Sequence, residues 1–448
     1  IRTALINYIL TNQAKKKYTD SKFFLRIEDT DKKRLKQEYV TSIINGLKWL
    51  NINWDGEIYF QSKRISRHQE IAVKLLETKK AFKCICTQEQ IKKKREENLK
   101  NNINIKRLCV NCEFNQQIQN LKKEYCIRIK IPNEGNILIK DMIRGKVEIK
   151  NIEIDNFIIL RSDLTPTYML SVVVDDHDMN INNIIRGDDH FNNTFRQYHI
   201  YKQLGWKIPN YAHLPLIHGL DGSKLSKRHG AIDINEFKKK GYLPKAIINN
   251  LILLGWSPKN NDEFIEIDEI IKRFDIKNLS KSSSIFDYQK LDFLNNFYLQ
   301  KEDNYMNFIK YIENNDLIKS YLKKDQEKIK KIYNAHKNKV KKLFEYIEII
   351  KVYFDIQFVT KPDDILNENF KNLLNKLLKK LKNIDNWDEA SLEFFIKNFI
   401  NEENIKFATF GKSLRHILIN SKHGISISLV MFILGKEIAV LRIKNYIK

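Results

Sequence analysis

Residues 23–31 read FFLRIEDTD, and this stretch decides the fold class. Its first five residues are apolar apart from Arg26, which predicts a short buried strand. Acidic and hydroxyl side chains follow at once, and Thr30 or Asp31 can cap a helix in which apolar residues recur at helical spacing over residues 39–50. A strand, an acidic loop and a helix in this order are typical of α/β folds.

Three later apolar runs repeat this arrangement. Residues 172–174, 184–186 and 213–217 are interpreted as buried strands, and polar residues follow each of them. A helix is expected from about residue 192 to residue 204. Strands that alternate with helices predict a parallel sheet, and such sheets bind ligands just past the carboxyl ends of their strands.

The overall charge points to a polyanionic partner. The chain has 448 residues, enough for about three domains. Lys and Arg number 79 against 55 Asp and Glu, which gives a net charge of +24. This charge favours nucleic acid as a partner, although a general bias towards Lys, Asn and Ile accounts for part of it. No run approaches the ~20 apolar residues of a membrane span, so we expect no transmembrane segment.

A basic loop carries the sharpest chemical signal. Residues 224–230 read KLSKRHG and follow a predicted strand and an Asp-Gly turn. Lys224 and Lys227 are three residues apart, and paired ammonium groups neutralise charge that develops on phosphate oxygens during displacement. A Lys-rich string is most often a solvated surface loop, but the position just past a strand favours a phosphate site.

This loop resembles the KMSKS signature of class I aminoacyl-tRNA synthetases. Five other stretches resemble the bacterial-type glutamyl-tRNA synthetases, and the resemblance runs to about Leu299. It implies that ATP and Mg²⁺ activate L-glutamate to glutamyl-adenylate, and that the glutamyl group then passes to the 3′ end of tRNA(Glu), with tRNA(Gln) also open. The stretches are FLRIEDTD (24–31), GLKWLNINWD (46–55), TPTYMLSVVVDDHDM (165–179), IRGDDH (185–190) and HLPLIH (213–218).

The same resemblance implies an ATP site. Lys227 would contact the phosphates in the transition state, and Lys224 and Ser226 would hold the loop in place. Asp189 would lie near the ribose or adenine. The implied ATP-binding residues are Lys224, Leu225, Ser226, Lys227, Arg228 and Asp189.

It also implies a glutamate site. Arg186 would pair with the side-chain carboxylate of the substrate through two parallel hydrogen bonds, which a lysine cannot form. Glu28 would hold the substrate ammonium, and Tyr168, Val172 and His190 would line the pocket. The alternative for Arg186 is a structural ion pair with Asp188 or Asp189.

The cysteines suggest a metal site in a reducing compartment. The spacings Cys84-x-Cys86 and Cys109-x-x-Cys112 suit a tetrahedral Zn²⁺ ion. Members of the resembled family often carry zinc here, but the second pair departs from their pattern, and metal-free buried thiols are the alternative. Cys126 is expected in the core. The histidines without ligand spacing are expected to be structural, namely His177, His199, His213 and His218.

Pattern and resemblance together predict an α/β chain with a helical tail. A Rossmann-type parallel-sheet catalytic domain is expected in two halves, with an inserted acceptor-binding domain between them that carries a Lys/Arg run at residues 92–95. A stem-contact helical region and an all-α anticodon-binding domain would follow. The expected bounds are 1–75 and 166–235 for the catalytic halves, 76–165 for the insertion, 236–304 for the stem-contact region and 305–448 for the anticodon-binding domain.

One family signature falls outside the sequence. The HIGH motif would lie before Ile1, so the chain as written is expected to be a catalytically impaired, truncated form of a complete enzyme. A non-catalytic tRNA-binding paralogue and a glutaminyl-tRNA synthetase relative are the alternatives, and the helical tail disfavours the second. The resemblance implies a monomer in the cytoplasm. An organellar location stays open because a targeting segment would lie upstream.

Overall fold

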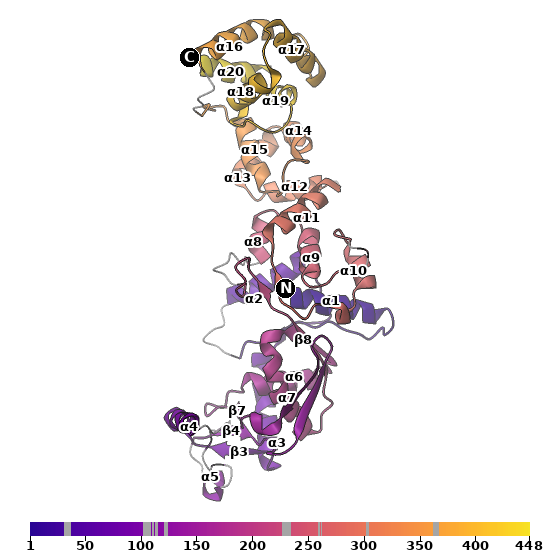
Figure 1. Cartoon of the computed structure of the whole chain (residues 1–448), viewed down its shortest axis with the longest axis vertical. Helices are drawn as coiled ribbons and strands as arrows, with labels where there is room; N and C mark the ends of the chain where they lie inside the picture. The colour runs from indigo at the N-terminus through magenta and orange to yellow at the C-terminus, as the bar shows by residue number, and fades with distance from the viewer. Residues whose placement is uncertain are drawn as a thin grey trace. The chain divides into compact units, whose positions relative to one another are not determined.

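The structure is a computed structural model with two units, each of which is described by itself. It describes residues 1–30, 37–101, 109, 112, 115–120, 124–225, 234–258, 260, 262–301, 304–361 and 367–448. The first unit comprises Ile1–Asn235 and Ile248–Asp287, and the second comprises Glu236–Ile247 and Tyr288–Lys448. The first unit mixes strands and helices, whereas the described residues of the second form helices and loops only (Figure 1).

The first unit opens with a helix and continues as an α/β arrangement. Its successive elements are α1 (Arg2–Lys15), β1 (Arg26–Ile27), α2 (Gln37–Trp49), β2 (Tyr59–Phe60), the 3₁₀-helix η1 (Gln61–Arg64), α3 (Ile65–Glu77), β3 (Ala81–Cys84), α4 (Gln88–Lys100), α5 (Gln116–Asn120), β4 (Cys126–Ile129), β5 (Asn136–Asp141), β6 (Gly145–Lys150), β7 (Ile158–Leu160), α6 (Tyr168–Asp178), β8 (Asn183–Gly187), α7 (Phe191–Leu204), β9 (Asn210–Leu214), β10 (Ile217–His218), α10 (Ile267–Arg273) and β11 (Ser284–Ile285). The helices α8 (Ile234–Lys239) and α9 (Pro244–Leu253) straddle the boundary between the units.

A four-stranded sheet positions the site. Its order is β6-β5-β9-β8, and β9 pairs in parallel with both β5 and β8. The register places Asp141 beside Tyr211 and Arg186 beside His213. The carboxyl ends of three parallel strands therefore present Asp141, His213 and Arg186 at one edge of the sheet.

The remaining strands form three smaller sheets. The strands β3, β4 and β7 pair antiparallel, while β1 pairs with β2 and β10 with β11, both in parallel. A shared core joins α3, α6 and α7 to the strands, with Leu75, Ile159, Val173 and Ile200 among its buried side chains. The helix α7 ends at Gly205, whose φ of +70° suits a residue without a side chain.

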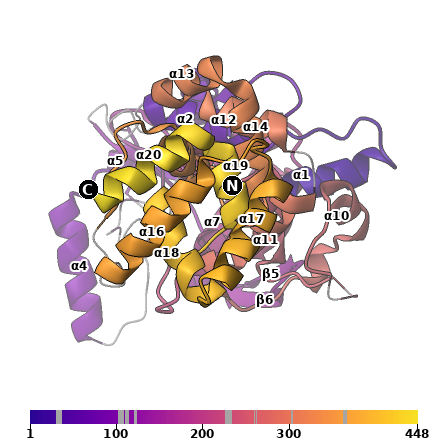
Figure 2. The same cartoon turned by 90° about the horizontal axis from the view of Figure 1, so that it is seen from above.

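The second unit is a series of packed helices. In the region coloured yellow, α19 lies against α17, α18 and α20 (Figure 2). The helices are α11 (Tyr288–Lys301), α12 (Tyr305–Ile312), α13 (Asp316–Lys324), α14 (Gln326–His336), α15 (Glu345–Phe354), α16 (Glu368–Leu381), α17 (Glu389–Glu402), α18 (Phe407–Ile419), α19 (Ile427–Leu434) and α20 (Lys436–Ile447). A transmembrane helix is absent from the described part of the chain.

The predicted fold class is confirmed, with one wrong element and two altered ones. Residues 172–174, predicted as a strand, lie inside helix α6. A short run of valines buried in a core has no period that separates a strand from a helix, and tertiary packing overrides its β-propensity. Only Arg26–Ile27 of the strand expected at residues 23–27 pairs with another strand. The strand expected at residues 213–217 is divided between β9 and β10.

Candidate functional site

Arg186 lies in a dense set of hydrogen bonds at the end of β8. Its Nε donates to His213 Nε2 at 3.1 Å, and its Nη2 donates to Thr194 Oγ1 at 2.7 Å and to the His190 carbonyl oxygen at 3.2 Å. The carboxylates of Asp188 and Asp189 have other cationic partners, Arg144 and Lys224. The structural ion pair considered as the alternative for Arg186 is therefore not observed among the described residues.

The helix α6 carries a row of side chains towards Arg186. Tyr168, Val172 and Asp176 follow one another at intervals of four residues and share a face of the helix. The hydroxyl of Tyr168 lies 3.4 Å from Nδ1 of His190. Burial raises the pKa of Tyr168, the negative charge of Glu28 adds to this and Arg186 opposes it, which places both charges near the phenol ring. Four of the five residues predicted to bind glutamate thus come together, and the fifth, Val172, is buried one turn from Tyr168.

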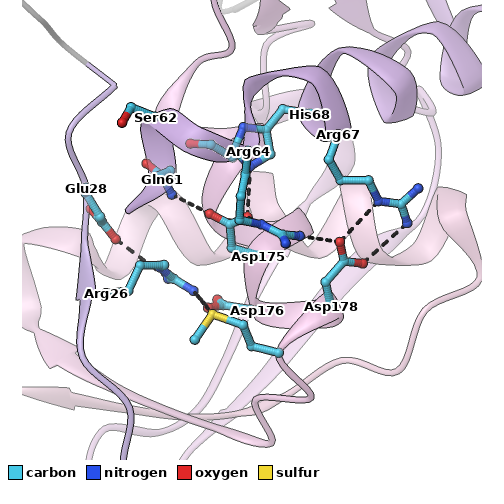
Figure 3. Close-up of polar contacts among 12 residues, drawn as sticks. Arg26, Glu28, Gln61, Ser62, Arg64, Arg67, His68, Asp175, Asp176 and Asp178 are labelled. Atoms are coloured by element: carbon cyan, nitrogen blue, oxygen red, sulfur yellow. Dashed lines mark hydrogen bonds and ion pairs between the residues drawn. The ribbon is translucent and has the colours of Figure 1, made fainter. Parts of the chain in front are cut away.

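Glu28 follows β1 and is held beside a buried ion pair (Figure 3). Arg26 Nη1 lies 2.8 Å from Asp176 Oδ1, and its Nη2 lies 3.7 Å from Glu28 Oε1. The Glu28 side chain is 43% exposed, yet the surrounding protein desolvates it. This desolvation raises the pKa of Glu28 with help from the charge of Asp176, while Arg26 and His190 oppose it.

A second buried carboxylate, that of Asp175, joins helix α6 to η1 and α3 beside this pair (Figure 3). Asp175 is fully buried and accepts hydrogen bonds from Gln61 Nε2 at 2.9 Å, Arg64 Nε at 2.7 Å and His68 Nε2 at 2.8 Å. Burial opposes ionisation, but the bonds from His68, Gln61 and Arg64 outweigh it and lower the pKa of Asp175. Sequence reasoning missed these three donors. Their spacing over residues 61–68 is helical, so a polar face turned towards the core is the signal that would have found them.

The described part of the basic loop contacts the end of β8. His218 and Lys224 form a β-bridge, and the Leu225 N–H donates to the Ile217 carbonyl oxygen at 2.9 Å. Lys224 Nζ lies 3.1 Å from Asp189 Oδ2, and both side chains are largely exposed. Burial opposes ionisation of Asp189, but the bond from Lys224 outweighs it and lowers the pKa. The other predicted loop residues, Ser226, Lys227 and Arg228, lie outside the described residues.

Four thiols converge in the segment between β3 and β4. The Sγ atoms of Cys84, Cys86, Cys109 and Cys112 all lie within 4.8 Å of one another, and the closest pairs are 3.3 Å, 3.4 Å and 3.8 Å apart. Thiolates placed about 2.3 Å from a tetrahedral zinc ion lie about 3.8 Å from one another, so this set fits zinc. The Sγ of Cys126 instead donates to the Cys84 carbonyl oxygen at 3.4 Å.

Two family models cover most of the chain. The model described as class I tRNA synthetases (E and Q), catalytic domain, matches residues 1–293. The model described as an anticodon binding domain matches residues 308–447. The first of these alone covers more than half of the sequence.

Full-length relatives and solved structures agree with these matches. A protein of Ehrlichia chaffeensis named glutamate–tRNA ligase 2 is 41% identical over 99% of this chain and 94% of its own length. One of Rickettsia prowazekii with the same name is 37% identical, again over 99% of this chain and 94% of its own length. The crystal structure of a glutamate tRNA ligase from Elizabethkingia meningosepticum in complex with its amino acid has a TM-score of 0.84 and 25% identity, over 100% of this chain and 95% of that one. The glutamate-tRNA synthetase of Elizabethkingia anophelis has a TM-score of 0.83 and 26% identity, over 100% of this chain and 96% of that one.

Proposed function

Because the chain belongs to the class I tRNA synthetases for glutamate and glutamine and is a glutamate–tRNA ligase, we propose that its amino-acid site lies between Arg186 and Glu28. The observation that carries this proposal is that both of these opposite charges act on Tyr168, whose hydroxyl lies 3.4 Å from Nδ1 of His190. Glutamate offers a side-chain carboxylate and an ammonium group, which match a guanidinium and a carboxylate in that order.

The chemistry requires positioning more than a nucleophile. The α-carboxylate of glutamate attacks the α-phosphorus of ATP, the bond from this phosphorus to the bridging oxygen breaks, and pyrophosphate leaves. The enzyme supplies alignment of the two substrates and neutralisation of the phosphate charge. Arg186 and Glu28 would fix glutamate at its two ends, so that the α-carboxylate has one direction in which to react.

The basic loop is proposed to serve the ATP phosphates. The ion pair between Lys224 and Asp189 is exposed, and exposed pairs contribute little stability, so Lys224 can exchange this carboxylate for a phosphate oxygen. By sequence resemblance, Leu225, Ser226, Lys227 and Arg228 would complete the contact, with Lys227 nearest to the reacting phosphate. A Mg²⁺ ion would bind the phosphates, as is usual for phosphoryl chemistry.

The tRNA contacts follow from the order of the segments. We propose that residues 76–165 bind the acceptor end and residues 236–304 the stem, and that residues 305–448 read the anticodon of tRNA(Glu). The halves 1–75 and 166–235 would form the catalytic domain. We also propose that the enzyme charges tRNA(Gln), that it is a monomer and that it is located in the cytoplasm. The net charge of +24 supports an RNA partner.

Pyrophosphate exchange tests the activity. The enzyme should exchange pyrophosphate into ATP when L-glutamate and tRNA(Glu) are present, and it should not do so with L-glutamine. The names of the relatives and of the similar solved structure fit this reaction rather than a non-catalytic paralogue or a glutaminyl-tRNA synthetase. Absence of exchange with glutamate would contradict the proposal.

Zinc is proposed as the ligand of the four-cysteine cluster, where it would hold the inserted segment in one conformation. We expect about one zinc per chain by elemental analysis. Cys109→Ser should lower this content and increase proteolysis between β3 and β4. Cys126→Ser, which removes a thiol outside the cluster, should retain the zinc. Equal zinc loss in both variants, or a zinc-free wild type, would overturn the assignment.

Asp176 is expected to control the charge of Glu28. In Asp176→Asn, Arg26 loses its buried partner and can pair fully with Glu28. The raised pKa of Glu28 should then fall, so the acid limb of kcat/KM for glutamate should move to lower pH. The KM for glutamate should rise about fivefold, because Arg26 now competes with the substrate ammonium. Asp178→Asn is the control on the same helix, and its carboxylate pairs with Arg64 and Arg67 instead. An acid limb that does not move would refute this role.

A further inference from the structure

A buried carboxylate and histidine join two strands beneath Arg186. The Nδ1 of His213 lies 2.7 Å from Oδ2 of Asp141, and neither side chain is exposed to solvent. Asp141 also accepts hydrogen bonds from the N–H groups of Ile143 and Arg144, both at 2.9 Å. Burial opposes ionisation of Asp141, but the bonds from His213 and from these two N–H groups outweigh it and lower the pKa. An ionised carboxylate can only accept, so the hydrogen must be on Nδ1 of His213.

The other ring nitrogen of His213 contacts the guanidinium. A neutral imidazole with its hydrogen on Nδ1 has a lone pair on Nε2, and Arg186 Nε donates to that atom at 3.1 Å. Thr194 Oγ1 lies 3.1 Å from the same Nε2 and accepts from Arg186 Nη2 at 2.7 Å. Asp141 therefore selects the tautomer of His213 that accepts from Arg186. Asp141, His213 and Thr194 are called the Arg186 support below.

Packing fixes the plane of the histidine ring. The ring of Phe191 meets that of His213 edge-on, with centroids 5.0 Å apart and an interplanar angle of 87°. The Tyr211 ring lies nearly parallel to it, with centroids 6.1 Å apart and an angle of 14°. His213 therefore presents Nε2 in one direction, and the guanidinium that donates to it is oriented before any ligand arrives.

The hydrogen bonds also determine which part of Arg186 can meet a substrate. Nε is engaged by His213, and both hydrogens of Nη2 have acceptors in Thr194 and the His190 carbonyl oxygen. Nη1 takes part in none of these three bonds, so it can recognise a carboxylate beside Tyr168, whose phenol also lies within hydrogen-bonding reach of Arg186. This differs from the two parallel hydrogen bonds that the family resemblance implies, because one edge of the guanidinium is already bound to protein.

We propose that Asp141, His213 and Thr194 are positioning residues that hold Arg186 so that its Nη1 end meets the side-chain carboxylate of glutamate. This inference rests on the proposed role of Arg186 in the amino-acid site. It predicts that changes in the Arg186 support weaken glutamate binding and leave the nucleotide site unaffected.

The test uses substitutions that preserve volume. His213→Phe keeps the ring between Phe191 and Tyr211 but removes both nitrogens. Thr194→Val keeps the shape and removes the acceptor of Nη2. In pyrophosphate exchange, each should raise the KM for glutamate about tenfold, with the KM for ATP within about twofold of wild type. His213→Gln supplies an amide oxygen that can accept from Arg186 Nε, so it should restore part of the glutamate affinity.

A matched control and a stability measurement separate positioning from mere structure. Asp178→Asn changes a carboxylate that pairs with Arg64 and Arg67 rather than with Arg186, and its KM for glutamate should stay at the wild-type value. Glutamate KM values unchanged in both His213→Phe and Thr194→Val would overturn the proposal, as would equal increases in the KM for glutamate and for ATP. If His213→Phe unfolds, the result for Thr194→Val decides. A wild-type KM for glutamate in Arg186→Lys would instead refute the proposed site itself.

Discussion

Arg186→Lys is expected to lower kcat/KM for glutamate about 100-fold and to leave the KM for ATP within about twofold of wild type. A lysine ammonium is a point charge on a flexible stem, whereas the guanidinium has five N–H donors in a fixed plane. Arg186 uses three of these donors to hold its own position against His213, Thr194 and the His190 carbonyl oxygen. Lysine cannot make these bonds and address a substrate carboxylate together.

The measurement is pyrophosphate exchange with glutamate varied at saturating ATP, and then with ATP varied at saturating glutamate. Arg144→Lys is the matched control, because Arg144 pairs with Asp188 near the same end of the sheet but is 40% exposed. It should change neither KM by more than about twofold, as exposed ion pairs contribute little. Wild-type glutamate kinetics in Arg186→Lys would exclude carboxylate recognition by this residue.

Much of the sheet that carries Arg186 could be predicted from local pattern. The run at residues 184–186 lies within β8, and the helix expected from residue 192 begins at Phe191. The strand was predicted from a short apolar run, and the helix from apolar residues that recur every 3.6 positions. Both signals depend only on residues that are close together in the sequence. The helical character of the chain beyond residue 305 was predicted on the same grounds and is confirmed for the described residues.

The partners of the site residues could not be predicted in this way. His213 was expected to be merely structural, because it has no ligand spacing in the sequence. Its contact with Asp141 joins residues 72 positions apart, and it exists only because β5 and β9 pair in parallel at one register. The Asp189–Lys224 contact likewise depends on the fold. The resemblance placed Asp189 at the nucleotide, and that role stays a prediction, as do those of Ser226, Lys227 and Arg228.

The valine run at residues 172–174 shows why one element was predicted wrongly. β-Branched residues favour strands when only propensity is considered. Here Val173 and Val174 are fully buried in the core, and helix packing outweighs the preference. In helix α6, Asp175 and Asp176 are about 100° apart around the helix axis. Asp175 binds Arg64, and Asp176 binds Arg26. A strand would have placed these two carboxylates on opposite faces.

Asp175→Ala is expected to destabilise the first unit by about 3 kcal/mol, because removal of a buried charge leaves its partners unpaired. His68 and Gln61 are buried and would each lose an acceptor, and Arg64 would lose one of its two carboxylate partners. The pKa of Asp175 is lowered in the folded state. The stability that the ionised Asp175 contributes is therefore present above the ordinary aspartate pKa of about 3.9, and it is lost as the pH falls through the lowered pKa. The difference in unfolding free energy between wild type and variant should therefore become smaller at acidic pH.

Urea unfolding combined with hydrogen exchange of peptides from α3 and α6 measures this effect in the unit concerned. Asp178→Ala is the matched control, because Asp178 lies on the same helix and also binds Arg64, but is 20% exposed. Water can replace Asp178 as a partner of Arg64 and Arg67, so this variant should lose less than about 1 kcal/mol of unfolding free energy. The contrast isolates burial, since both substitutions remove one carboxylate that pairs with the same arginine. Equal losses of unfolding free energy in the two variants would show that the hydrogen bonds to Gln61 and His68 do not determine how stably α6 packs against η1 and α3.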